Sequence, residues 1–215
     1  MPTQHLATRT LIAADPRLAA LILDVGPCRL LTQPTPPDPS TFFESVCESI
    51  VSQQLSTKAS DTIFARVLAL GGGKLLPPED LLRVDEQTLR AVGLSGQKVK
   101  YLRDLAQKIT NGEVRLQDLP ALDDEQVIEH LCCVKGIGRW TAEMFLMFRL
   151  GRPDILPVAD LGIQQGIKKL YNLRDDPTPE RMAKIAKPWR PYRSVACWYI
   201  WRHHERTPKT KPARS

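Results

Sequence analysis

The stretch of this sequence with the clearest chemical signature is "VKGIGRW", residues 134–140, in which two glycines flank one isoleucine. Glycine has no Cβ, so Gly136 and Gly138 allow the chain to turn tightly and to bring bare backbone close to a partner. A helix that begins near Gly138 points free N–H groups outward and adds the positive end of its dipole, which suits a phosphate group. Lys135 and Arg139 flank the turn and can add positive charge. These residue types predict a grip on a phosphate backbone.

Helices must enter and leave this turn if it is to hold a phosphate, and the sequence predicts both. Asp123 can cap an incoming helix whose apolar residues recur at helical spacing. The outgoing helix is apolar on nearly every side, which is typical of a central, buried helix. Ile137 would pack the turn against these two helices. A plain helix–helix turn with a glycine C-cap has the same local pattern, so both interpretations stay open at this point.

Helical periodicity extends through almost the whole chain, and no segment predicts a strand. The pattern indicates an all-α protein with about ten helices. Residues 1–40 are expected to form an N-terminal helix and a stiff connector, with four prolines in residues 33–40. Residues 41–204 are the expected core, and residues 205–215 form a basic tail that is expected to be disordered.

The composition is that of an ordinary soluble globular protein, with 42% apolar and 25% charged residues among 215. A net charge of +6 suits a polyanionic partner, although the excess is modest. The five cysteines have no spacing typical of a zinc site, an iron–sulfur cluster or a disulfide framework, which favours reduced thiols inside a cell. We find no signal-peptide pattern and no apolar run near the roughly 20 residues that span a bilayer.

The longer string "LCCVKGIGRWTA", residues 131–142, resembles the helix-hairpin-helix motif of DNA repair proteins. In that family the hairpin backbone holds phosphates, often with a monovalent cation on its carbonyl groups. The resemblance implies that six residues of the hairpin bind DNA: Lys135, Gly136, Ile137, Gly138, Arg139 and Thr141. It implies no cofactor, and no metal ion apart from a structural Na⁺ or K⁺ on the backbone of Val134 and Gly136.

Asp160 lies 22 residues after Gly138, at the end of a proline-punctuated loop and the start of a helix. This position matches the HhH-GPD superfamily of DNA glycosylases, in which an aspartate follows the hairpin at a similar distance. The match implies a catalytic role. A fixed carboxylate stabilises the oxocarbenium-like sugar as the base departs, and it can orient or deprotonate the attacking water. Helix capping explains the same position, and the two roles are compatible because a helix N-terminus stabilises negative charge.

Two tryptophans point to one branch of this superfamily. Trp140 stands where the bifunctional members carry a nucleophilic lysine, so the resemblance implies hydrolysis by water without a Schiff base. The string "WRPYRSVACWYIW", residues 189–201, resembles the alkyladenine branch, of the bacterial AlkA and yeast Mag type. That match places Trp201 in the base pocket opposite Trp140, together with Met144. Aromatic faces favour a positively charged alkylated purine, although ordinary core packing would also explain either tryptophan.

The string "SIVSQQLS", residues 49–56, lies between two predicted helices and resembles the segment that pushes a wedge into the duplex in these enzymes. Register with the family makes Gln54 the wedge, with Gln53 and Leu55 beside it. The wedge fills the gap left by the everted nucleotide. Two solvated glutamines at a helix end are the alternative interpretation.

The resemblance covers residues 41–204 and implies two helical subdomains with the active-site cleft between them. We expect the short form, without the N-terminal β domain of the longer AlkA enzymes. The function implied is that of a DNA-3-methyladenine glycosylase II type N-glycosidic hydrolase. It would flip and excise 3-methyladenine and 7-methylguanine from double-stranded DNA as a monomer. Alternatives are the same fold acting on oxidised or deaminated bases, and a non-catalytic DNA-binding module. The expected location is the cytoplasm of a bacterium, near the nucleoid, or the nucleus of a eukaryote, with no membrane partner.

Overall fold

A computed structural model of the chain describes residues 2–30 and 38–206, with side chains described for 5–30 and 38–204. Regular structure in these residues is helical throughout, with twelve α-helices and three 3-10 helices, and one isolated bridge pairs Gly71 with Lys74. The prediction of an all-α protein is confirmed. The count exceeds the expected ten, partly because residues 2–25 form two helices instead of one. Most of the proline-rich connector and of the basic tail lies outside the described residues.

The chain divides into two compact units. The first unit comprises Met1–Pro34 and Leu146–Ser215, and the second comprises Thr35–Phe145. The division falls inside helix α9, after Phe145. The expected boundaries at residues 40 and 204 stay a prediction.

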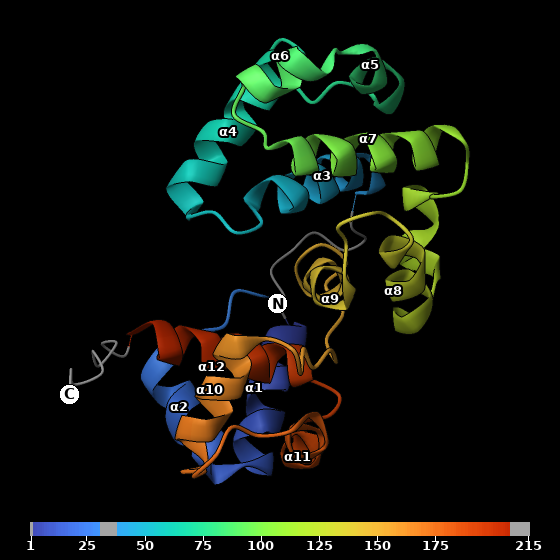
Figure 1. The fold of residues 1–215 in the computed structure, drawn as a ribbon. Helices are drawn as coiled ribbons and strands as arrows, with labels where there is room; N and C mark the ends of the chain where they lie inside the picture. The colour runs from blue at the N-terminus through green and yellow to red at the C-terminus, as the bar shows by residue number, and fades with distance from the viewer. Residues whose placement is uncertain (1, 31–37, 207–215) are drawn as a thin grey trace, which may run out of the picture. The chain divides into compact units, whose positions relative to one another are not determined.

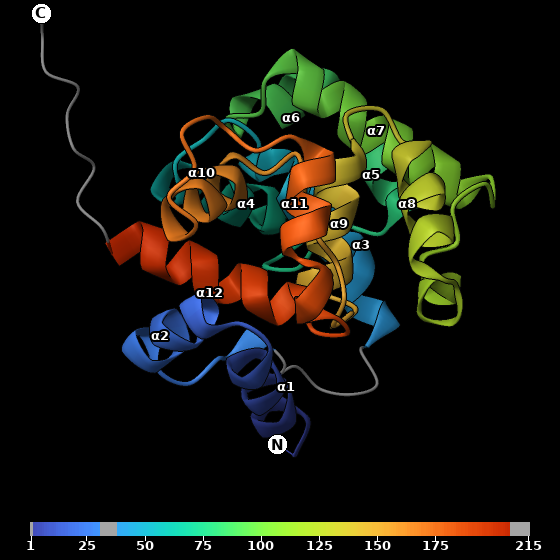
Figure 2. The ribbon, with the colours of Figure 1, turned by 90° about the horizontal axis from the view of Figure 1, so that it is seen from below.

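The first unit is built around its last helix, α12 (Arg193–Arg206). Residues 195–200 of α12 are all buried, so this helix is covered on every side along that stretch. Figures 1 and 2 show α2 and α10 beside it, and both helices pack against it. Gly166 of α10 permits this approach, because a Cβ there would lie 2.1 Å from Cγ2 of Ile200. The other helices of the unit are α1 (Pro2–Ala14), α2 (Pro16–Val25), α10 (Leu161–Leu170), α11 (Pro179–Ile185) and the 3-10 helix η4 (Lys187–Trp189).

In the second unit, helix α3 (Phe42–Ser52) lies against α7 (Gly96–Thr110), the longest helix of the unit, as Figure 1 shows. Its remaining helices are η2 (Pro39–Thr41), α4 (Thr57–Ala69), α5 (Pro78–Arg83), α6 (Glu86–Ala91), η3 (Leu116–Ala121), α8 (Asp124–Cys132) and most of α9 (Arg139–Phe148). The predicted cap at Asp123 is confirmed as a full capping box with Gln126. Ser95 caps α7 in a similar way, because its side chain accepts the backbone N–H of Lys98.

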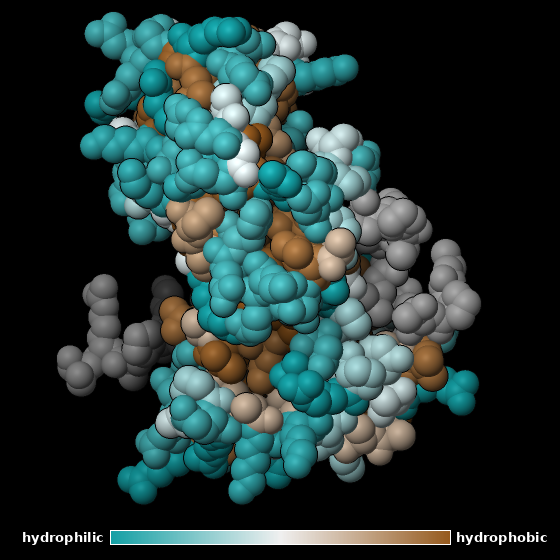
Figure 3. All heavy atoms as spheres, turned by 90° about the vertical axis from the view of Figure 1, so that its right-hand side faces the viewer, coloured by the Kyte–Doolittle hydropathy of each residue, from teal (hydrophilic) through white to brown (hydrophobic). Residues whose placement is uncertain are grey.

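The surface in Figure 3 is mostly hydrophilic, with smaller apolar areas between the polar side chains. Among the described residues, no helix combines the length and the apolar character needed to cross a lipid bilayer.

Candidate active site

The turn predicted to hold a phosphate lies between α8 and α9, and its first glycine is obligatory. Gly136 has a φ of 83°, in the left-handed region that favours glycine. A Cβ built on Gly136 would lie 2.1 Å from Cδ2 of Tyr101 on α7, so a side chain cannot be accommodated. Gly138 is different, because a Cβ there would meet no atom within 4 Å. The bend itself therefore requires Gly136, whereas Gly138 borders open space.

Helix α7 and Gln53 hold this hairpin in place. The backbone N–H of Lys135 donates to Oδ2 of Asp104 at 2.8 Å, and the Lys135 ammonium lies 3.4 Å from Oδ1 of the same carboxylate. The Gln53 side chain donates from Nε2 to the carbonyl oxygen of Gly136 at 2.8 Å. Ile137 is buried and packs the hairpin against the protein, as predicted. The hairpin backbone is thus fixed from several sides.

The two basic residues beside the hairpin differ in what their charges meet. The guanidinium of Arg139 makes a fork of bonds to the carboxylate of Glu125, at 2.9 and 2.5 Å, and a further ion pair of 3.2 Å to Glu143. The bond from Arg139 holds the pKa of Glu125 below its usual value. The side chain of Lys135 is 74% exposed. Lys135 is therefore the more accessible cation, and Arg139 is largely occupied within the second unit.

Asp160 is the N-cap of α10, as the alternative interpretation of the sequence suggested. Its Oδ1 accepts the backbone N–H of Ile163 at 2.8 Å. The same oxygen accepts the indole N–H of Trp201 at 2.9 Å. A carboxylate held by two N–H donors has a fixed position, which is what electrostatic stabilisation of a developing positive charge requires.

An aromatic pair adjoins this carboxylate within the first unit. The ring of Phe148 stacks on Trp201 with 5.8 Å between centroids and an angle of 27° between the planes. Gly162 keeps the contact close, because a Cβ there would lie 3.1 Å both from Oδ1 of Asp160 and from Cδ1 of Trp201. Phe148 and Gly162 bring two contacts to the site that the sequence did not predict.

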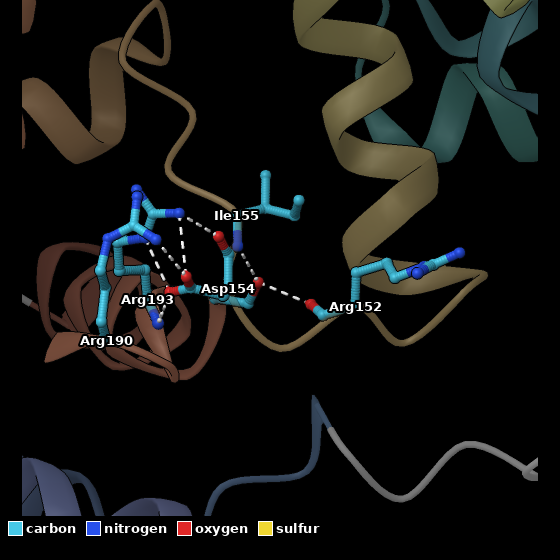
Figure 4. A network of polar contacts seen from close by, with 6 residues as sticks. Arg152, Asp154, Ile155, Arg190 and Arg193 are labelled. Carbon is cyan, nitrogen blue, oxygen red and sulfur yellow. Dashed lines mark hydrogen bonds and ion pairs between the residues drawn. The ribbon is translucent and has the colours of Figure 1, made fainter. Parts of the chain in front are cut away.

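The loop that leads to Asp160 is clamped by Arg190 and by the first turn of α12 (Figure 4). Asp154 accepts bonds from the guanidinium of Arg193 at 2.7 and 3.0 Å and from Arg190 at 3.0 Å. Ser194 is fully buried, and its hydroxyl donates to the carbonyl of Arg152 at 2.7 Å while accepting from the N–H of Ile155 at 2.9 Å. Helix α12 therefore fixes the loop with its first residues and the carboxylate with Trp201.

Gln54 lies in the turn of residues 53–56 that joins α3 to α4. It is exposed, and it is one of two residues other than glycine with a positive φ in the described part of the chain, at 59°. A left-handed backbone is uncommon for such a residue and is found more often at functional sites. The role of Gln54 as a wedge stays a prediction.

The chain is similar to known proteins in its sequence and in its fold. The family model described as HhH-GPD superfamily base excision DNA repair protein matches residues 47–191. The chain belongs to this superfamily.

Three similarities support the assignment. The sequence is 34% identical over 200 residues to DNA-3-methyladenine glycosylase 1 of Schizosaccharomyces pombe, covering 92% of this chain and 85% of the relative. The structure of that organism's 3-methyladenine DNA glycosylase Mag1 in complex with abasic DNA matches with a TM-score of 0.80, covering 95% of this chain and 99% of the other. A DNA-3-methyladenine glycosidase of Bacillus halodurans matches with a TM-score of 0.79 and 42% identity, covering 92% and 88% of the two chains.

In this HhH-GPD protein, the structure brings together two of the predicted site residues, Asp160 and Trp201, in the first unit. The second unit contains the hairpin residues and three further predicted site residues, Gln54, Trp140 and Met144. Trp140 is 44% exposed, and Met144 is partly exposed. Within the described residues, no group of three or more His, Cys, Asp or Glu side chains is placed to bind a metal ion.

The clamp on the Asp160 loop was not predicted, although Arg193 and Ser194 stand in the string that carried the family resemblance. The presence of Arg193 and Ser194 in that string was the only feature of the sequence that indicated a role for them near the site. Their partners Asp154 and Arg152 lie about 40 positions earlier in the chain, at sequence separations of 39 and 42 residues, where no periodic pattern connects them.

Proposed function

We propose that this HhH-GPD protein is a monofunctional DNA glycosylase that flips and hydrolytically excises alkylated purines, 3-methyladenine and 7-methylguanine, in base excision repair. The observation that carries the proposal is the Asp160 carboxylate, held by Ile163 and by Trp201 beside an aromatic pair. The names of the similar proteins, which are 3-methyladenine glycosylases, support the same substrate class.

Asp160 would act on the sugar of the everted nucleotide. The bond between C1′ and the purine nitrogen breaks, and its electron pair neutralises the positive charge of the alkylated base. Positive charge then develops on the sugar, where the carboxylate of Asp160 stabilises it. Water adds its oxygen to C1′ and passes a proton to Asp160 or to solvent, which leaves an abasic site.

The aromatic pair would favour a charged base over a neutral one. A cation is attracted to the face of an indole by the electrons of the ring, and this attraction strengthens when water is excluded. Trp201 would supply such a face, with Phe148 stacked on it. We assign Trp140 and Met144 to the same base-binding role, on the family resemblance. Trp140 also replaces the lysine of bifunctional relatives, so water is the proposed nucleophile.

The hairpin would hold the DNA backbone through six residues: Lys135, Gly136, Ile137, Gly138, Arg139 and Thr141. The carbonyl oxygens of Val134 and Gly136 would bind a Na⁺ or K⁺ ion. The Val134 oxygen also accepts the N–H of Ile137, and the Gly136 oxygen also accepts the side-chain amide of Gln53. Each carbonyl oxygen has two lone pairs, so these bonds do not exclude the ion. No other cofactor is proposed, and one chain would act on one lesion as a monomer.

Base release from defined lesions tests the proposed function. A panel of duplexes would contain 3-methyladenine, 7-methylguanine, an oxidised base or a deaminated base. Asp160→Asn should reduce the rate of base release by orders of magnitude, because the amide carries no charge. It should leave DNA binding intact, because the amide still caps α10. Asp85→Asn is the matched control, since Asp85 caps α6 in the same way, with its carboxylate accepting the N–H of Thr88.

The outcomes separate the alternatives. Release of methylated purines by the wild type and by Asp85→Asn, but not by Asp160→Asn, supports the proposal. Preferential release of oxidised or deaminated bases would favour the same chemistry on another substrate. DNA binding without release of any base would favour a non-catalytic binding module.

A further inference from the structure

The turn of residues 53–56 contains a backbone conformation that needs support from outside the turn. Gln54 has a φ of 59°, and a residue with a side chain pays a conformational free energy for this region. Such a conformation persists when its neighbours fix the chain on both sides. Three contacts within the second unit do so.

The first contact reaches from the turn to the hairpin. The side-chain amide of Gln53 donates to the carbonyl of Gly136 at 2.8 Å, across 83 residues of sequence. Gly136 cannot move aside easily, because the ring of Tyr101 covers its Cα and the N–H of the neighbouring Lys135 is bound to Asp104. Gln53 is therefore tied to a rigid point.

The other two contacts close the end of α3. The ammonium of Lys98 donates to the carbonyl of Val51 at 2.7 Å, and the N–H of Leu55 donates to the carbonyl of Ser52 at 3.1 Å. The carbonyl groups at a helix C-terminus lack partners within the helix, so these bonds replace water there. The turn is thereby held before any DNA is present.

We propose that Gln53 is a positioning residue that couples the phosphate-binding hairpin to Gln54, the residue predicted to act as the wedge. The inference rests on the proposed function of the protein. Gln53 does not itself enter the duplex. The hydrogen bond from its side-chain amide fixes the position of Gln54 relative to the hairpin. A DNA backbone bound by the hairpin therefore lies at a fixed distance and orientation from Gln54.

The coupling predicts a specific pattern of loss. Gln53→Met keeps the length of the side chain and removes the donor. One hydrogen bond between uncharged groups corresponds to a change of about three- to tenfold in an equilibrium or a rate. Eversion of 7-methylguanine paired with cytosine should slow by about that factor, whereas eversion opposite a mispaired thymine, which is already loosened, should change little. Affinity for DNA containing an abasic site should stay within about twofold, because the hairpin N–H groups are untouched.

The experiment measures eversion by the fluorescence of 2-aminopurine next to the lesion, together with single-turnover base release. Five proteins are compared: wild type, Gln53→Met, Gln54→Ala, the double variant, and Gln87→Met, which places the same substitution at an exposed position on α6. If Gln53 acts through Gln54, the double variant should evert the paired lesion as fast as Gln54→Ala alone. Gln87→Met should match the wild type.

Each outcome bears on the coupling. Independent losses that multiply in the double variant would overturn it, as would equal slowing on the paired and mispaired lesions, or a wild-type rate for Gln53→Met. Base release by the wild type is measured in the same series. Its absence would refute the proposed function, while the fluorescence still compares eversion among the variants because it does not require cleavage.

Discussion

The indole Nε1 of Trp201 donates a 2.9 Å hydrogen bond to Oδ1 of Asp160, the same oxygen that accepts the backbone N–H of Ile163. One carboxylate oxygen thereby joins the start of α10 to the second half of α12. The tryptophan proposed to bind the base is also a donor to the proposed catalytic group, so its ring face and its N–H can be tested separately.

Trp201→Phe should retain an aromatic face and lose the donor. A hydrogen bond to a charged acceptor contributes about 1.5–3 kcal/mol, which corresponds to a loss of about ten- to a hundredfold. We expect this loss in the single-turnover rate of base release, with little change in the affinity for DNA containing an abasic site. Trp198→Phe, the same substitution elsewhere in α12, is the control. An unchanged rate for Trp201→Phe would show that the N–H does not contribute.

The two glycines of the hairpin should respond differently to alanine. Gly136→Ala places a Cβ against the ring of Tyr101 at a positive φ, so it should lower the free energy of unfolding and weaken binding to all DNA sequences. Gly138→Ala meets open space and should leave stability nearly unchanged. If a phosphate approaches the backbone there, Gly138→Ala should still weaken DNA binding. Thermal unfolding and fluorescence anisotropy on lesion-free duplex distinguish the two effects, and equal stability losses would contradict the geometry.

The clamp on the Asp160 loop should depend on Arg193 more than on Arg190. The side chain of Arg193 is 18% exposed, whereas that of Arg190 is 59% exposed. Arg193→Lys replaces the planar guanidinium, which donates several hydrogen bonds to the partly buried Asp154, with an ammonium group. This change should lower the free energy of unfolding by about 1–3 kcal/mol. Arg190→Lys should cost less than about 1 kcal/mol, as for exposed ion pairs. Hydrogen exchange of residues 152–160 should accelerate in Arg193→Lys, and similar exchange in both variants would argue against the ranking.

Acid should destabilise the protein partly through Asp15. Burial alone would raise the pKa of Asp15, but hydrogen bonds from the side chains of Trp189 and Tyr171 and from the N–H groups of Leu18 and Arg17 bring it below the ordinary value of 3.8. A lowered pKa in the folded state means that ionised Asp15 stabilises the fold above pH 3.8, and that this contribution is lost as the pH falls through the folded-state pKa. Asp15→Asn should therefore be less stable at neutral pH and less sensitive to acid. Denaturant unfolding from pH 7 to pH 3 measures both, and parallel pH profiles would contradict the assignment.

Local signals accounted for most of the helices. Asp123 caps its helix as predicted, and Ser95 and Thr178 cap theirs by the same local rule, because a cap depends on residues three positions apart. The family resemblance singled out Asp160 and Trp201 as candidate site residues, but it did not predict the hydrogen bond between them. Their proposed roles, like those of Gln54 and Trp140, stay predictions.

Contacts between distant parts of the chain could not be predicted. The bond from Gln53 to Gly136 and the clamp between Asp154 and Arg193 join residues 83 and 39 positions apart. The engagement of Arg139 by Glu125 and Glu143 was missed because charge alone does not indicate which partner a guanidinium will find. A single sequence contains no periodicity that links such pairs.

Ser194 and Trp201 are seven residues apart on α12, which is about two helical turns, so both side chains point the same way. Inserting or deleting one residue between them would rotate the indole by about 100° relative to the hydroxyl. Substitutions along this stretch of α12 can therefore be tolerated. An insertion or deletion there would turn the Trp201 indole away from the side that the Ser194 hydroxyl faces. Descendants of this gene with altered base preference should differ by substitution in α12, and gaps in their alignment should fall elsewhere.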